Sequence, residues 1–141
     1  MTTTTRFDGT TASARTAGTD GLARLALKLD AAVTGLNGLA YLALATVLDS
    51  WFGIATSVQY PVGAFLLLFA LGVLAAGTRR RISRPALTAI AVANLLWVVL
   101  SLTVTVSGAL SPTGLGTVWL VLQALTVGGF AGLQLLGLKR L

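Results

Sequence analysis

The 141-residue chain contains no cysteine, no histidine and no glutamate. Without cysteine there is no disulfide, no thiolate nucleophile and no soft-metal site. Without histidine the commonest general base and metal ligand is missing. The carboxylates are those of Asp8, Asp20, Asp30 and Asp49. We therefore expect no enzymatic activity, no metal and no cofactor.

Charge is also scarce, since 10% of the residues are charged and 55% are hydrophobic, with a mean hydropathy of +0.88. Soluble domains carry about 25% charged residues, so this composition predicts an integral membrane protein. The net charge of +6 and the isoelectric point near 11.3 resemble those of nucleic-acid binders. However, the cations are few and lie between apolar segments instead of on one face of a folded domain, so we expect no nucleic-acid partner.

Four apolar segments, joined by three short connections, make up most of the chain. A peptide group without a hydrogen-bond partner is strongly disfavoured in hydrocarbon, so each segment is predicted to be helical. Polar and apolar residues do not alternate along them, which argues against a closed barrel. The expected fold is an all-α, four-transmembrane-helix bundle over residues 20–141, with spans at about 31–48, 61–77, 86–106 and 115–137.

The segment before the first span divides into two parts. Residues 1–19 are rich in Thr, Ala and Gly, and they cannot bury enough surface to offset their ordering entropy, so we expect a disordered cytoplasmic tail. Asp20 then resembles a helix N-cap. The next turns separate apolar from cationic residues, with Leu22, Leu25, Ala26 and Leu29 on one side and Arg24 and Lys28 on another. We interpret them as an amphipathic stretch on the membrane surface.

Asp30 and Asp49 are predicted at the two ends of the first span, at headgroup depth. For Asp30 the favoured interpretation is a solvated interfacial carboxylate, and the alternative is a pair with an arginine of the central loop. Ionisable groups inside the membrane usually mark proton relays and ion pathways. Their expected absence from the span interiors argues against a proton-coupled transporter.

All ten Lys and Arg residues lie in the tail and first turn, in the central loop "GTRRRISRP" and at the C-terminus. Loops rich in Lys and Arg stay in the cytoplasm, so both termini are predicted on the cytoplasmic side of the bacterial inner membrane. Four loop arginines are candidates for setting topology and for contacting anionic lipid headgroups, namely Arg79, Arg80, Arg81 and Arg84. Ser83 is a candidate cap and Pro85 a first-turn residue for the third span.

One alternative concerns the first span. Ala43 and Ala45 form a small-x-small pattern behind a basic region, as at a signal-peptide cleavage site. Because the apolar run continues to Leu48, we favour a retained span.

Uncharged polar residues inside the spans are the candidate binding groups: Asn37, Asn94, Trp97, Ser101, Gln123 and Gln134. At 1.5 Å per residue, Asn37 and Asn94 lie roughly 10 Å from the cytoplasmic edge, and Gln134 lies nearer that edge. These amides are interpreted as interhelical hydrogen bonds, worth about 0.6 kcal/mol each. The alternative is a small cavity for an uncharged ligand or lipid headgroup, with Trp97 or Tyr41 stacking on it.

Small residues recur on several spans and let helix backbones approach closely. The candidate packing positions are Gly35, Gly38, Gly72, Gly128 and Gly132. The fourth span contains a GxxxG that is a candidate dimer contact. A faint repeat also relates residues 72–80 to residues 132–140, in which two glycines and two cations coincide.

The stretches "ANLLWVVLS", "LSPTGLG" and "VLQALTVGGFAGLQLLGLKR" resemble small, uncharacterised four-span integral membrane proteins of high-GC bacteria. The resemblance covers roughly residues 22–140 and implies the four-helix layout. It implies no activity, ligand or catalytic residue, because none is assigned to that group.

These patterns favour a non-enzymatic inner-membrane protein that acts as an assembly or accessory subunit. Its expected partners are anionic lipids at the cytoplasmic face and a second copy of the chain or a larger membrane complex. The alternative is a carrier or channel-like protein for a small neutral or lipid-like solute that uses the amides.

Overall fold

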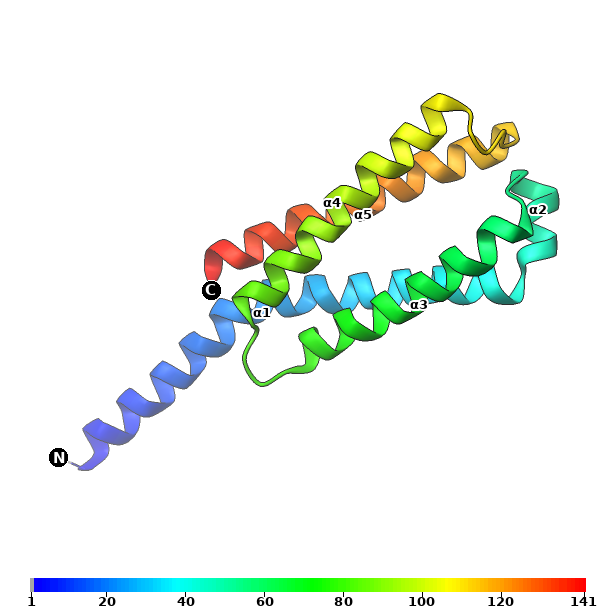
Figure 1. Cartoon of the computed structure of the whole chain (residues 1–141). Coiled ribbons are helices and arrows are strands. Elements are labelled where there is room, and N and C mark those ends of the chain that lie inside the picture. The colour runs from blue at the N-terminus through cyan, green and yellow to red at the C-terminus, as the bar shows by residue number, and fades with distance from the viewer. Residues whose placement is uncertain (1) are drawn as a thin grey trace.

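The computed structural model describes the backbone of residues 2–141 and the side chains of residues 19–141. Over that part of the chain it consists of five helices and no strand (Figure 1). The helices are α1 (Thr2–Ala43), α2 (Ala45–Phe52), α3 (Thr56–Thr78), α4 (Arg84–Ser107) and α5 (Gly114–Arg140). The disordered tail predicted for residues 1–19 stays a prediction, because the side chains of residues 1–18 lie outside the described part.

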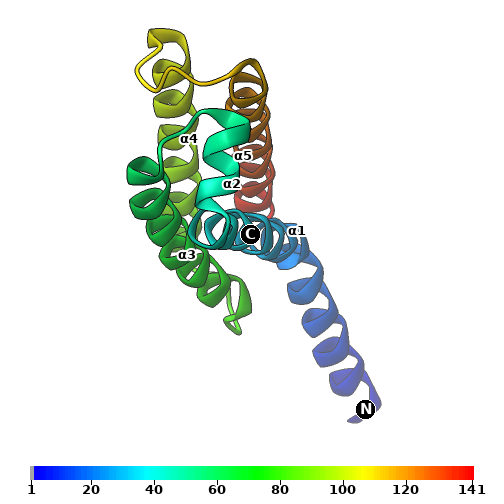
Figure 2. The ribbon, with the colours of Figure 1, turned by 90° about the vertical axis from the view of Figure 1, so that its right-hand side faces the viewer.

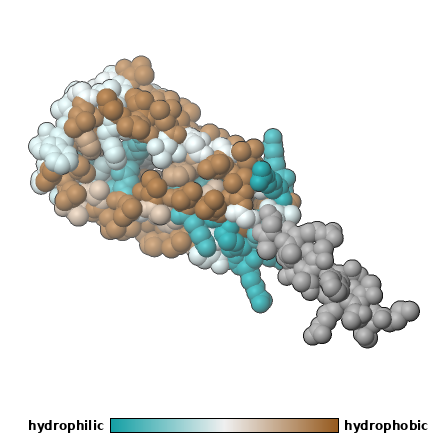
Figure 3. Space-filling view, turned by 180° about the vertical axis from the view of Figure 1, so that it is seen from behind, coloured by the Kyte–Doolittle hydropathy of each residue, from teal (hydrophilic) through white to brown (hydrophobic). Residues whose placement is uncertain are grey.

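Three helices, α3, α4 and α5, are long and apolar enough to cross a membrane. The segment Thr19–Ala43 together with α2 makes a fourth if the pair, bent by 95°, counts as one span. Apolar side chains cover the helices between a hydrophilic end and a pale, weakly polar end (Figure 3). Length and composition thus indicate a helical membrane protein, as the sequence predicts.

The helices form two layers, with α4 and α5 lying over α1 and α3 (Figure 2). The main contacts join α1 to α3, α4 to α5 and α1 to α5, whereas α3 and α4 barely touch. The buried residues of α3 alternate at spacings of four and three: Gln59, Gly63, Leu66, Ala70, Val73 and Gly77. A mean spacing of 3.5 keeps one seam of a helix against its neighbour. Contact along one side of α3 leaves its α4 side open.

The first helix presents to the bundle a different face from the one that its leucines suggest. Ala23, Leu27 and Asp30 are 0% exposed, whereas Leu25 and Leu29 are 55% and 43% exposed. Of the side predicted to be apolar, Leu25 and Leu29 face outward and Ala26 is buried, and the placement of residues 20–30 on the membrane surface stays a prediction. In a bilayer, lipid solvates leucine as well as a protein core does, so small and polar residues take the helix contacts.

The first long helix, α1, ends at Ala43, inside the predicted span of residues 31–48, and α2 turns away from it by 95°. The amide nitrogen of Gln59, a buried residue of α3, donates to the carbonyl oxygens of Ala45 at 2.9 Å and Ile54 at 2.7 Å. Gly53 ends α2 with a left-handed φ of 69°, which favours glycine. The bend is therefore held by a polar side chain from another helix.

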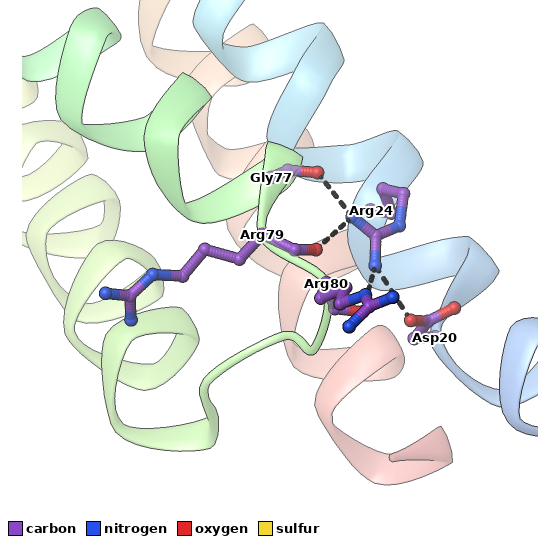
Figure 4. Close-up of polar contacts among 5 residues, drawn as sticks. All are labelled: Asp20, Arg24, Gly77, Arg79 and Arg80. Atoms are coloured by element: carbon purple, nitrogen blue, oxygen red, sulfur yellow. Dashed lines mark hydrogen bonds and ion pairs between the residues drawn. The ribbon is translucent and has the colours of Figure 1, made fainter.

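One end of the bundle gathers the cations (Figure 4). Arg24 donates to the carbonyl oxygens of Gly77 at 2.8 Å and Arg79 at 2.7 Å, and it pairs with Asp20 at 2.9 Å. A guanidinium at a helix C-terminus satisfies carbonyls that lack partners within the helix. Arg24 therefore joins the start of the first span to the end of α3.

The start of α4 follows the predicted pattern. The Ser83 hydroxyl accepts a hydrogen bond from the Ala86 amide at 3.3 Å, and Pro85 lies in the first turn. Arg84 reaches the other hairpin, where it donates to the carbonyl oxygens of Leu138 and Leu141 at 3.4 and 3.3 Å. The three cationic segments therefore share one end of the bundle.

Candidate functional site

The most unusual group in the bundle is the carboxylate of Asp30, which is 0% exposed. It lies between α1, α4 and α5 and forms no ion pair within the described side chains. The expectation of a solvated interfacial carboxylate is therefore wrong, and so is the alternative of a pair with a loop arginine. Both expectations followed from a predicted first span that begins at residue 31, which puts Asp30 at its edge.

Three uncharged side chains donate to this carboxylate. Asn94 Nδ2 and Gln134 Nε2 both donate to Asp30 Oδ2, at 2.8 and 2.7 Å. Thr34, one turn further along α1, donates to Oδ1 at 2.8 Å. Hydrogen bonds to an ionised acceptor are roughly twice as strong as neutral ones. We call Asp30, Thr34, Asn94 and Gln134 the Asp30 cluster.

The Asp30 cluster lies well below the cationic end. Asn94 follows Arg84 by ten residues and Gln134 precedes Arg140 by six, which corresponds to depths of about 15 and 9 Å. Asn94 also donates to Gln134 Oε1 at 3.0 Å, so the two amides hold each other in place. At these depths the carboxylate is within the expected hydrocarbon region of a membrane.

A cavity of about 270 Å³ lies beside the Asp30 cluster, between α1, α3, α4 and α5. Two members of the cluster, Thr34 and Asn94, form part of its wall. Most of the remaining wall is apolar, and five aromatic side chains line it: Phe65, Phe69, Trp97, Trp119 and Phe130. Ligand sites have this character, an apolar chamber with a few convergent polar groups.

Trp97 stands where the α3 and α4 sides of the cavity meet. Its ring stacks on Phe65 with centroids 6.1 Å apart, and Phe65 stacks in turn on Phe69 at 6.0 Å. The indole nitrogen of Trp97 is buried and has no hydrogen-bond partner within the described residues. Since buried donors are nearly always satisfied, this unpaired N–H is an exception within the bundle.

A second polar group lies further toward the end that carries α2. Tyr41 donates to Gln123 Oε1 at 3.1 Å and accepts from the indole nitrogen of Trp119 at 2.9 Å. A second cavity of about 200 Å³ adjoins it, and it shares Trp97 and Gln123 with the first. These two side chains therefore separate two neighbouring chambers.

The structure distributes the predicted polar residues among these places. Asn94 and Gln134 belong to the Asp30 cluster. Asn37 and Gln123 line the first cavity, and Ser101 lines the second. Asn37 makes no hydrogen bond to Asn94 or Gln134. Asp30, not Asn37, is the residue of α1 that bonds to these two amides. The signal was a spacing of three and four residues at Ala23, Leu27, Asp30 and Thr34, the seam of a packed helix.

The predicted packing glycines occupy different surroundings. A Cβ on Gly38 would meet the Gly63 carbonyl oxygen and the Leu67 nitrogen, both at 2.9 Å. Gly35 and Gly128 have ordinary neighbours, at 3.5 and 3.8 Å, whereas Gly72 and Gly132 face open space. Other glycines that the sequence did not single out for packing also lie close to neighbouring helices. A Cβ on Gly77 would meet Leu27 at 3.1 Å, and a Cβ on Gly137 would meet Ala23 at 2.7 Å.

The loop arginines have two surroundings. Arg79, Arg80 and Arg81 are exposed, and the Arg79 side chain points away from the Arg24 contact (Figure 4). Arg84 is exposed as well, but its guanidinium is engaged at the end of α5. The first three are therefore the ones whose charges are presented to solvent or lipid headgroups.

The side chains around the first cavity are aromatic, aliphatic, hydroxyl and amide groups. No side chain that lines the first cavity is titratable. Among the described residues, no group of three or more carboxylate, imidazole or thiol side chains is placed to hold a metal ion. What the site offers is aromatic faces, amide groups, one unpaired indole N–H and a buried carboxyl group behind the wall.

Comparison of the chain with protein-family models, with curated proteins and with solved structures finds no match.

Proposed function

We propose that the chain crosses the bacterial inner membrane four times, with α1 and α2 as one bent crossing and both termini in the cytoplasm. The support is the gathering of all the described cationic segments at one end of the bundle, which the positive-inside rule assigns to the cytoplasm. Replacement of Arg79, Arg80, Arg81 and Arg84 by glutamine should loosen or invert this orientation in a reporter-fusion assay. An unchanged orientation, with only lipid association reduced, would assign these arginines to headgroup binding instead.

Within the membrane, we propose that the protein is a non-enzymatic binding or carrier protein for a small, largely apolar solute. The observation that supports this is the aromatic-lined cavity of about 270 Å³ beside the Asp30 cluster. If the amides served only to join helices, we would expect the aromatic rings to pack against the amides and leave no cavity. Here the unpaired indole nitrogen of Trp97 and the amide of Asn37 instead accompany a cavity large enough for a substituted benzene ring.

The solute reaches the cavity from the bilayer, between α3 and α4. These helices barely touch, and the stacked pair Phe65 and Trp97 spans the space between them. An aromatic pair contributes about 1 kcal/mol beyond its buried area, so thermal motion separates these rings readily. Entry from the membrane suits an apolar solute, which is concentrated there.

Filling the cavity tests this function. Ala93 lines the cavity and Ala89, one turn earlier on α4, is exposed. In lipid nanodiscs, small alkylbenzenes should change the tryptophan fluorescence of the wild type and of Ala89→Phe, but not that of Ala93→Phe. Equal responses from the two variants would show that the solute binds elsewhere.

An assembly or accessory role is a second proposal, favoured by the open surface at Gly129 and Gly132 on α5, where a Cβ meets no atom within 4 Å. Another helix could approach closely there. Gly132→Leu should lower the yield of crosslinked dimers in native membranes. Gly72→Leu is the control, since Gly72 faces open space on α3, and its dimer yield should not change. An undiminished yield for Gly132→Leu, or a lowered yield for Gly72→Leu, would show that this face of α5 is not the dimer contact.

A further inference from the structure

The Asp30 carboxyl group has no cationic partner among the described side chains. Both carboxylate oxygens accept hydrogen bonds, and all three donors are uncharged. Arg24, six residues earlier on α1, is committed to Asp20 and to the end of α3. Lys28, two residues earlier, is exposed and forms no ion pair with Asp30. A buried charge in a bundle of apolar helices is strongly disfavoured unless an opposite charge approaches it.

The carboxylate also lies directly behind the wall of the cavity. Thr34 and Asn94 each donate to it, and each lines the cavity. A ligand in the cavity is therefore separated from the charge by a single hydrogen-bonded side chain, a distance of about 6 Å. Because no titratable side chain lines the cavity, an ionised Asp30 would set the sign of the potential that such a ligand meets.

The aromatic side chains of the cavity favour the same sign of charge. The face of an aromatic ring is negative, so it attracts cations that lie within about 6 Å of its centre. Five such rings line this cavity: Phe65, Phe69, Trp97, Trp119 and Phe130. Rings around a cavity and a carboxylate behind it together form a site for a cation with an apolar surface.

On the basis of the binding function proposed above, we propose that Asp30 is ionised and is the counter-charge for a ligand of this cavity, a small organic cation of the quaternary ammonium class. The oxygens of Asp30 are already occupied by Thr34, Asn94 and Gln134. A primary amine would need to displace one of these donors to be satisfied. A quaternary ammonium has no N–H, so it responds to the charge through space and leaves the cluster intact.

Charge and shape are separated by two probes of nearly equal size, benzyltrimethylammonium and its uncharged isostere neopentylbenzene. At an effective dielectric constant of about 20 and a separation of about 6 Å, Coulomb's law predicts that an ionised Asp30 raises the preference for the cation over the neutral probe by about a hundredfold relative to Asp30→Asn. Binding is measured by tryptophan fluorescence in neutral-lipid nanodiscs and corrected for partition into empty discs.

Asp30→Asn keeps the shape of the side chain and removes its charge. We expect this variant to bind neopentylbenzene as the wild type does and to lose the preference for the cation. Asp49→Asn is the matched control, since it makes the same change in α2, away from the cavity lining, and it should keep the preference. Size-exclusion chromatography verifies that each variant is folded.

Each outcome bears on the proposal. A preference for the cation in Asp30→Asn equal to that of the wild type would overturn it and leave the binding function standing. A wild type that binds the neutral probe as tightly as the cation would overturn it even if Asp30→Asn failed to fold. Binding of neither probe by the wild type would overturn the binding function as well.

Discussion

Replacement of Asn94 by leucine tests whether the Asp30 cluster stabilises the bundle as a charged network. Leucine resembles asparagine in shape but removes both of its hydrogen bonds, at 2.8 Å to Asp30 and 3.0 Å to Gln134. A hydrogen bond to a charged group contributes about 1.5–3 kcal/mol, and an ordinary bond between membrane helices contributes about 0.6 kcal/mol. The sum predicts a loss of about 2–4 kcal/mol in the free energy of unfolding.

The same substitution at Asn37 is the control. Asn37 also faces the cavity, but no hydrogen bond joins it to another described residue. Asn37→Leu should therefore change stability by less than about 0.5 kcal/mol. Reversible unfolding of both variants in mixed detergent micelles, followed by circular dichroism, gives the two free energies.

The outcome separates a charged network from simple interhelical hydrogen bonds. A loss below about 1 kcal/mol for Asn94→Leu would show that Asp30 carries no charge that needs this donor, because an uncharged pair is worth about 0.6 kcal/mol. Equal losses at Asn37 and Asn94 would refute the reasoning altogether, since the structure gives only one of them partners.

Three further predictions concern the packing and the helix ends. Gly38→Ala should lower the melting temperature, with a cost of about 1–3 kcal/mol, because its Cβ meets backbone atoms of α3 at 2.9 Å. Gly72→Ala, in open space, should be neutral or stabilising, and a larger loss of stability at Gly72 than at Gly38 would contradict the packing. Arg24→Gln should destabilise the bundle by about 1–2 kcal/mol because carbonyls at the end of α3 lose their donor, whereas Lys28→Gln, at an exposed position, should not; equal melting temperatures would count against this cap. Gln59→Leu leaves the Ala45 and Ile54 carbonyls without their donor, so amide hydrogen exchange in residues 45–54 should accelerate while exchange in α5 does not; unchanged exchange would mean that the bend does not depend on Gln59.

Much of the fold follows from local pattern. An apolar run of about 20 residues in lipid has no alternative to the helix, so the helices between residues 56 and 140 agree closely with the predicted spans. The Ser83 cap and Pro85 mark the start of α4 because both act on the backbone next to them. The packing face of the first helix does not follow from its leucines, because Leu25 and Leu29 point outward.

The candidate site depends on side chains that are far apart in sequence. Asn94 and Gln134 were identified as polar residues inside spans, but their partner was not, because Asp30 was placed at the membrane edge. Gln59 lies in a stretch that was interpreted as a loop, and its role at the bend depends on two carbonyls on other segments. No local pattern indicates such a contact.

The sequence by itself determined that the chain is apolar, helical and cationic in three separated segments, because those properties depend on composition and on neighbouring residues. Only the tertiary structure decided which face of the first helix turns inward, and therefore that Asp30 is buried. In lipid, the inward face is chosen by close packing and hydrogen bonding to the other helices, not by hydrophobicity. The aromatic cavity between α3 and α4 was decided in the same way, by which helices touch and which do not.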